Sequence, residues 1–142
     1  MDVGIHLPQY GHATGPDSIR RAARHAEDLG FAHVWVSDHI VSPVAQEYPS
    51  PYLYDPLGTL AFAAAITSRV GLGTSVLVAP QRNGLAVANS LASLDSLSEG
   101  RLIVALGLGW SRPEFDACCD VRSASSSSSM HPRRHLESGG IG

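Results

Sequence analysis

Lysine is absent from this 142-residue sequence, and all ten basic side chains are arginines. At most two of these arginines are adjacent, so they form no basic stripe that could neutralise a phosphate backbone. We therefore expect no binding to nucleic acid. The formal net charge of -3 is ordinary for a soluble protein.

Long apolar runs are also missing, and Met1 is followed by an aspartate rather than by a basic and then an apolar segment. These absences argue against a secretory signal and against a transmembrane helix, so no membrane partner is expected. The two cysteines, Cys118 and Cys119, are adjacent, which fits neither a disulfide framework nor a tetrahedral metal site. We expect no metal and a reducing, cytoplasmic location.

Short apolar runs that alternate with helical patterns make up most of the chain. Strands are predicted near residues 3–7, 31–37, 72–78 and 102–106, and helices over about 17–29, 55–68 and 83–99. The expected N-caps of these helices are Asp17 or Ser18, then Asp55, then Asn83 or Gly84.

This regular alternation predicts a parallel sheet covered by helices, in the α/β class. The third and fourth strands are nearly all apolar, which is typical of strands that are buried on both faces. With 44% apolar residues, the chain can form one core without the help of disulfides or metals.

Residues 118–142 differ in character from residues 1–117. They include seven serines, five of them consecutive from Ser125 to Ser129, and show no helical or strand periodicity. Ser111 and Glu114 form a capping box for a helix that barely begins before this change. We therefore divide the chain into a folded domain, 1–117, and a low-complexity, disordered tail, 118–142.

Parallel βα folds bind their ligands at the carboxyl ends of the strands. Asp38 and His39 follow the second predicted strand, and a histidine there could orient a ring, donate a proton or stabilise charge. The alternative is that Asp38 caps a turn and His39 lies on the surface. Gly107, Leu108 and Gly109 follow the fourth strand, where glycines could either cradle a phosphate or simply allow a tight turn.

Five short segments carry a family resemblance: GIHLPQ at 4–9, VWVSDH at 34–39, DPLGTLA at 55–61, LGTSVLV at 72–78 and LDSLSEGRL at 94–102. In order and spacing they resemble the luciferase-like monooxygenase superfamily, over residues 1–117. The similarity is greatest to its branch of deazaflavin (coenzyme F420)-dependent oxidoreductases.

The resemblance implies a (β/α)₈ TIM barrel that binds a flavin or deazaflavin at its C-terminal face. It also implies a homodimer formed through the second and third helices, here near residues 56–68 and 84–97. The implied activity is hydride transfer between coenzyme F420 and a small organic substrate. The alternative is an FMN-dependent monooxygenase of the same superfamily.

By position, the resemblance places Asp38 and His39 at the reactive face of the cofactor, with His39 as the catalytic proton donor or charge stabiliser. Ser75 and Val76 would form a bulge in the third strand behind the cofactor ring, with a cis peptide bond between them.

The resemblance also places Gly107, Leu108 and Gly109 beside the cofactor. The sugar-phosphate dehydrogenases of this branch carry a glutamate where this chain has Trp110, which counts against a sugar-phosphate substrate.

A complete (β/α)₈ barrel needs about 250 residues, so the chain is expected to be the N-terminal half, with about four βα units. We expect this half alone to be catalytically inert and to self-associate, because its edge strands and inner face lack partners. A further alternative is a non-catalytic fragment of a broken gene, with a frameshift near codon 118.

Overall fold

The computed structural model describes residues 1–41 and 53–118. Most of the loop that follows His39, and the predicted tail from residue 119 onward, lie outside the described residues. The division into a domain and a disordered tail therefore stays a prediction.

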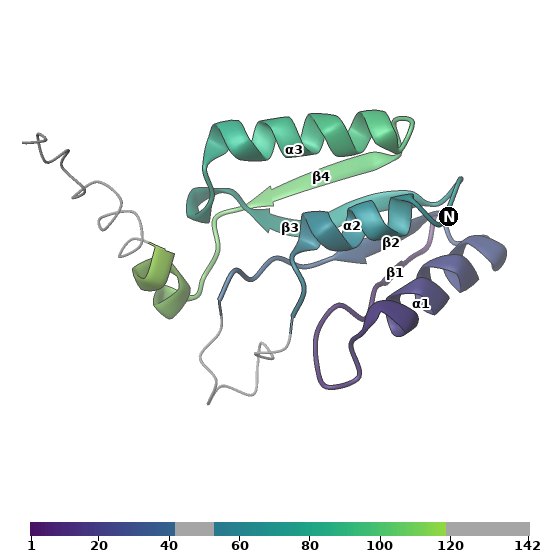
Figure 1. The fold of residues 1–142 in the computed structure, drawn as a ribbon, viewed down its shortest axis with the longest axis horizontal. Coiled ribbons are helices and arrows are strands. Elements are labelled where there is room, and N and C mark those ends of the chain that lie inside the picture. The colour runs from purple at the N-terminus through teal and green to yellow at the C-terminus, as the bar shows by residue number, and fades with distance from the viewer. Residues whose placement is uncertain (42–52, 119–142) are drawn as a thin grey trace, which may run out of the picture.

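Four strands alternate with the helices α1, α2 and α3 along the described chain, and helical residues 112–118 follow the last strand (Figure 1). The strands are parallel and lie in the order β1-β2-β3-β4, which confirms the predicted parallel sheet. The elements are β1 (Gly4–His6), α1 (Pro16–Asp28), β2 (His33–Val36), α2 (Pro56–Ala64), β3 (Gly71–Val78), a 3₁₀ helix η1 (Ala79–Gln81), α3 (Gly84–Leu97) and β4 (Leu102–Gly107).

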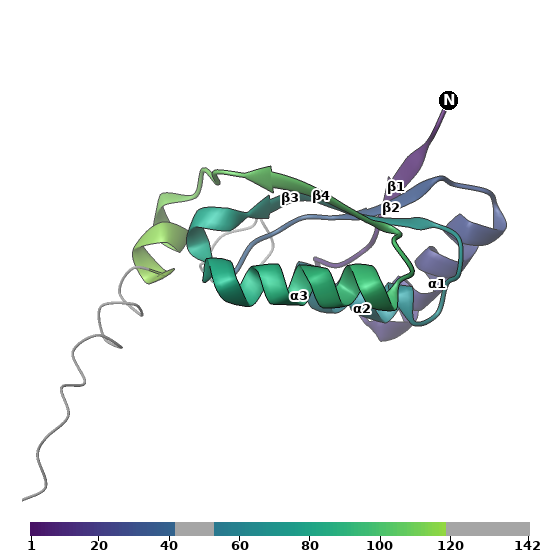
Figure 2. The same ribbon diagram turned by 90° about the horizontal axis from the view of Figure 1, so that it is seen from above.

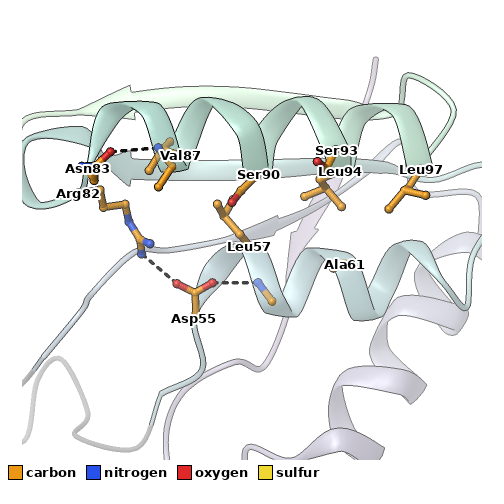
Figure 3. Close-up of a pocket in the computed structure, with 12 residues that line it drawn as sticks. Asp55, Leu57, Ala61, Arg82, Asn83, Val87, Ser90, Ser93, Leu94 and Leu97 are labelled. Carbon is orange, nitrogen blue, oxygen red and sulfur yellow. Dashed lines mark hydrogen bonds and ion pairs between the residues drawn. The ribbon is translucent and has the colours of Figure 1, made fainter.

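Side-chain caps begin two of the helices, as Figure 3 shows. The Asp55 carboxylate accepts the N–H of Gly58 at 2.9 Å, and the Asn83 side chain accepts the N–H of Ala86 at 3.1 Å. The predicted caps of α2 and α3 are therefore confirmed. The predicted cap of α1 is wrong, because α1 already begins at Pro16, whose ring presets the backbone angle of a first helical turn.

Helix α2 ends at Ala64, about four residues earlier than predicted. The Arg101 guanidinium donates three hydrogen bonds of 3.1 Å, to the carbonyl oxygens of Ala64, Thr67 and Val70. A cation that binds the last carbonyls of a helix stabilises its end. An arginine from the start of β4 thus fixes where α2 stops, a contact that no local pattern reveals.

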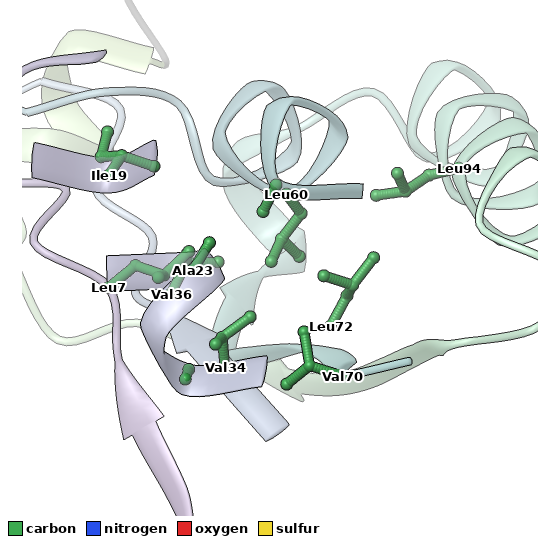
Figure 4. Packing of buried hydrophobic residues seen from close by; sticks show 11 residues of the cluster. Leu7, Ile19, Ala23, Val34, Val36, Leu60, Val70, Leu72 and Leu94 are labelled. Atoms are coloured by element: carbon green, nitrogen blue, oxygen red, sulfur yellow. The ribbon is translucent and has the colours of Figure 1, made fainter. Parts of the chain in front are cut away.

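The hydrophobic core lies between the sheet and the helices (Figure 4). Val34 and Val36 of β2 and Leu72 of β3 are fully buried there, against Ala23 of α1 and Leu60 of α2. Each aliphatic side chain of this size contributes about 1.5–3 kcal/mol when it leaves water. This packing holds the strands in place and so fixes where their carboxyl ends lie.

All three helices lie on the same side of the sheet in Figure 2. The prediction that both faces of the last two strands are buried is therefore wrong for β4, where Ile103 is 38% and Leu106 63% exposed. Leu102 packs against the core, so Ile103 lies on the face of the sheet away from these helices, and β4 is also an edge strand. β1 is the other edge, as expected for four units of a barrel.

Trp35 lies on the face opposite the core, since its neighbours Val34 and Val36 point into the core. Its indole covers the backbone of both adjacent strands. A Cβ atom added at Gly4 or at Gly73 would come within 2.3 Å or 2.2 Å of the Trp35 ring. The glycines of β1 and β3 are therefore required by the tryptophan that lies over them.

Strand β3 is irregular at the predicted place. Its pairing with β4 shifts register between Thr74 and Leu77, and the peptide bond between Ser75 and Val76 is cis. The predicted bulge and the predicted cis bond are both confirmed. At the bulge, both Ser75 and Val76 are exposed.

The Glu27 carboxylate, at the end of α1, fixes the turn that leads into β3. It accepts backbone N–H groups of Ser68 at 2.9 Å, Arg69 at 2.6 Å and Val70 at 2.9 Å. Burial opposes ionisation, but these hydrogen bonds outweigh it and hold the pKa of Glu27 below its ordinary value of 4.5.

We expect Glu27→Gln to lower the free energy of unfolding by about 1 kcal/mol at pH 7, because charge-assisted hydrogen bonds are lost. A depressed pKa stabilises the fold above the unfolded-state value, and this stabilisation disappears as pH falls through the folded-state value. Urea unfolding across the acid range measures both effects. Asp28→Asn, at the next residue, is the matched control. An equal loss in both variants would contradict the prediction.

Candidate active site

The carboxyl ends of β2, β3 and β4 surround a cavity of about 520 Å³. All seven site residues predicted from the sequence line it: Asp38, His39, Ser75, Val76, Gly107, Leu108 and Gly109. The other lining residues are Ser37, Val78, Gln81, Trp110, Ser111 and Glu114. Residues from three separate parts of the chain therefore meet at the end of the sheet where parallel βα folds bind ligands.

The Asp38 side chain is fully buried and is held by two partners. Its Oδ2 accepts the backbone N–H of Val78 at 2.8 Å and the Nε–H of Arg82 at 2.9 Å, while its Oδ1 accepts from Nη2 of Arg82. Arg82 also donates to Asp55 at 3.1 Å (Figure 3). The carboxylate thus ties the end of β2 to the end of β3 and to the start of α2.

Arg82 remains charged in this setting. Partial burial disfavours its charged form, but the hydrogen bonds and charges of Asp38 and Asp55 outweigh that effect and raise the pKa of Arg82. A buried aspartate is tolerable only with such a partner, because an unpaired buried charge is strongly destabilising.

His39 lies at the edge of the cavity, with 20% of its side chain exposed. Its Nδ1 is 2.8 Å from Oε1 of Glu114, which is almost completely buried. The indole of Trp110 packs edge-on against the imidazole, with the ring centroids 6.3 Å apart. The imidazole is therefore held by contacts on two sides and can present a proton or a lone pair to the cavity.

Gln81 adds a third polar side chain to the pair formed by His39 and Glu114. Its Nε2 donates to Oε2 of Glu114 at 3.4 Å, and its Oε1 is a buried acceptor without a hydrogen-bond partner. Buried acceptors are normally satisfied, so an unsatisfied one in a cavity suits a ligand that donates a hydrogen bond.

Two glycines shape the opposite wall. A Cβ atom at Gly107 would lie 2.2 Å from Cγ2 of Val76, and one at Gly109 would lie 2.7 Å from Cγ1 of Val78. Gly109 also has a φ of 79°, which only glycine adopts easily. These glycines are thus explained by close packing and a tight turn. Val76, Gly107 and Leu108 form an apolar wall that suits a planar ring.

Sequence reasoning did not single out Arg82, Gln81 or the pairing of Glu114 with His39. A weak signal exists for Gln81 and Arg82, because they lie in the short segment between the end of β3 and the start of α3. The sequence indicates Glu114 only as a helix-capping residue. Within residues 1–41 and 53–118, no cluster of three metal-binding side chains occurs. In the same residues, no helix is long and apolar enough to cross a bilayer.

Comparison with known proteins identifies the family. Residues 1–125 match the model of the luciferase-like monooxygenases. The chain belongs to this family.

The F420-dependent glucose-6-phosphate dehydrogenase of Kineococcus radiotolerans is 38% identical over 97 residues, which cover 66% of this chain and 27% of that enzyme. An uncharacterised protein of Mycobacterium tuberculosis is 36% identical over 107 residues, covering 66% and 38%. The chain thus spans less than two-fifths of the length of these relatives.

Solved structures of luciferase-like enzymes share the fold. A monooxygenase from Streptomyces bottropensis superposes with a TM-score of 0.71 at 36% identity, covering 83% of this chain and 36% of that one. The oxygenating constituent of 3,6-diketocamphane monooxygenase from Pseudomonas putida, solved with FMN, gives 0.69 at 19% identity, covering 83% and 32%. The second likeness shows the fold alone. The four βα units are those of a luciferase-like TIM barrel.

Arg82→Met tests the ion pair beneath the site. Removing Arg82 leaves the Asp38 carboxylate buried without its cation, so we expect a loss of about 3–5 kcal/mol in the free energy of unfolding. Arg112→Met is the control, because Arg112 forms an exposed ion pair with Asp116 and should cost less than about 1 kcal/mol. Urea denaturation measures both. Similar losses in the two variants would mean that the buried pair has no special weight.

Proposed function

We propose that this site binds coenzyme F420 and serves hydride transfer between that cofactor and a small organic molecule. The observation that carries the proposal is the gathering of all seven predicted residues around one cavity. The F420 dependence of the Kineococcus radiotolerans relative supports the choice of cofactor.

The cavity fits a planar ring system. Val76, Gly107 and Leu108 offer an apolar wall, and Ser75 and His39 offer polar groups beside it. We propose that these residues hold the cofactor ring, while Asp38 acts indirectly by fixing the loop that carries His39. The bound deazaflavin would supply the hydride acceptor or donor.

We propose that His39 moves the proton that accompanies hydride transfer, or stabilises the charge that develops. Its exposed ring edge at the cavity and its fixed orientation suit that role. Trp110 lies beside His39, at the position where the sugar-phosphate dehydrogenases of the branch carry a glutamate. An apolar indole there favours a less polar substrate than a sugar phosphate.

Four βα units form one wall of the site, and we propose that turnover requires a complete barrel and takes place in the cytoplasm. The 142-residue polypeptide by itself is then expected to be inactive, to bind cofactor weakly and to self-associate through its open sheet. Size-exclusion chromatography and a titration with F420 test this. A monodisperse monomer that binds F420 with micromolar affinity would contradict it.

An FMN-dependent monooxygenase is the second candidate, favoured by the likeness to the Streptomyces bottropensis monooxygenase. The test uses a version of this chain extended to a complete barrel, which we call the full-length enzyme. Titration of the full-length enzyme with F420 and with FMN, followed by measurement of oxygen consumption, separates the two. Tight F420 binding without oxygen consumption supports the first proposal. Tight FMN binding with oxygen consumption supports the second.

His39→Ala in the full-length enzyme should lower kcat by about 10²–10⁴-fold, because proton transfer contributes mainly in the transition state. The dissociation constant of the cofactor should change by less than about threefold. Steady-state kinetics and a fluorescence titration measure the two quantities. If kcat stays within about threefold of the parent, His39 has no catalytic role.

We also propose that the family's homodimer forms through α2 and α3. A groove of about 550 Å³ runs between these helices (Figure 3), lined mostly by small and apolar residues. Leu97 lines this groove and is 82% exposed, which is costly for a leucine that faces water.

Leu97→Glu should therefore shift the full-length enzyme from dimer to monomer, because it places a charge in the apolar groove. Leu85→Glu is the matched control, since Leu85 is equally exposed on α3 but does not line the groove. Analytical ultracentrifugation reads the result. Dimers that persist in Leu97→Glu would place the interface elsewhere.

A further inference from the structure

The buried partner of His39 comes from far along the chain. Glu114 belongs to the helical residues 112–118 that follow β4, and it lies 75 residues from His39 in sequence. Its side chain is 2% exposed, and its two oxygens have different partners, Nδ1 of His39 and Nε2 of Gln81. A nearly buried carboxylate that contacts the candidate catalytic histidine can control the orientation and the protonated nitrogen of its ring.

The hydrogen bonds restrict the protonation of this group. The Gln81 Nε2 group can only donate, so Oε2 of Glu114 acts as an acceptor. A carboxylate has only acceptors, so Nδ1 of His39 donates the hydrogen bond to Oε1 of Glu114. In neutral His39, Nδ1 therefore carries the hydrogen, and Nε2 carries the lone pair.

We propose that Glu114 is the positioning residue of His39: its carboxylate holds Nδ1 protonated and thereby makes Nε2 the atom that exchanges a proton with substrate. This inference rests on the proposed function for the role of Nε2, but the tautomer itself does not depend on it. If the substrate carried a hydroxyl group to be oxidised, Nε2 would accept its proton, and bound F420 would supply the hydride acceptor. In the reverse direction, the imidazolium would return that proton to the carbonyl oxygen.

Other contacts support a fixed imidazole. Trp110 packs edge-on against the ring, so rotation about the side chain would lose this contact as well as the hydrogen bond. Gln81 holds the far oxygen of Glu114, so the carboxylate cannot turn without breaking its second contact. A catalytic histidine oriented by a buried carboxylate is a recurrent arrangement, because the wrong tautomer presents N–H where a lone pair is needed.

The test reads the tautomer directly, by ¹⁵N NMR of the histidine ring nitrogens in the full 142-residue chain. Sedimented protein can be used, so self-association does not prevent the measurement. In the wild type above the titration range of histidine, Nδ1 of His39 should resonate as a protonated nitrogen and Nε2 as an unprotonated one. The reverse assignment in the wild type would overturn the proposal, whatever any variant does.

Glu114→Met removes the acceptor while keeping an unbranched side chain of similar length. It should shift His39 toward the Nε2–H tautomer. Asp116→Met, on the same helical segment, is the matched control and should leave the spectrum of His39 unchanged. His6 is an internal reference, because its Nδ1 lies 2.9 Å from the carbonyl oxygen of Leu7 and should stay protonated in both variants. An unchanged His39 tautomer in folded Glu114→Met would also overturn the proposal.

Kinetics of the full-length enzyme separate this inference from the proposed function. Glu114→Met should lower kcat about tenfold or more with little change in KM, and it should have no further effect in a His39→Ala background, since both changes act through one group. If His39→Ala is harmless but the tautomer is as expected, the proposed function fails and the positioning contact stands. If His39→Ala is severe but the double variant is additive, the positioning role fails alone.

Discussion

The ion pair between Arg82 and the buried carboxylate of Asp38 is the constraint on which the site depends. Three segments that are remote in sequence meet at it: the end of β2, the turn after β3 and, through Asp55, the start of α2. The contact between Asp38 and Arg82 is shielded from bulk water, so screening by salt is weak there, whereas the contact between Arg82 and Asp55 is exposed. Because His39 follows Asp38 directly, the position of the imidazole is set by this pair before any ligand arrives.

A second constraint acts on the other side of the cavity. Gly107 and Gly109 let β4 and the following turn lie against Val76 and Val78, closer than any side chain would allow. That close approach brings the helical residues 112–118 near enough for Glu114 to reach His39. The glycines thus contribute to the proposed chemistry indirectly, since they permit the approach of the segment that carries the Glu114 carboxylate.

The sequence was informative wherever the cause is local. The periodicity of apolar residues predicts the strands. Asp55 and Asn83 predict the starts of two helices, because an N-cap side chain bonds to a backbone N–H three residues away. It failed where the cause is remote. The early end of α2 depends on Arg101, and the exposure of Ile103 depends on which face of the sheet the helices α1–α3 leave uncovered. Neither fact can be found in a window of ten residues.

The residues of the candidate site show the same difference between local and remote causes. Asp38 and His39 could be found from their place after a strand, whereas Arg82 and Glu114 could not, because their partners are 44 and 75 residues away.

The two adjacent residues also have different environments, although they share a loop. Asp38 is fully buried, and both of its carboxylate oxygens accept hydrogen bonds from within the protein, whereas one edge of the His39 ring faces the cavity. The buried Asp38 carboxylate is tied to Arg82, and losing that ion pair would leave a charge buried without its partner. The partly exposed imidazole of His39, next to the buried carboxylate of Glu114, is accessible to a ligand in the cavity. The physical environment, rather than position in the sequence, therefore separates the residue that builds the site from the residue that can act in it.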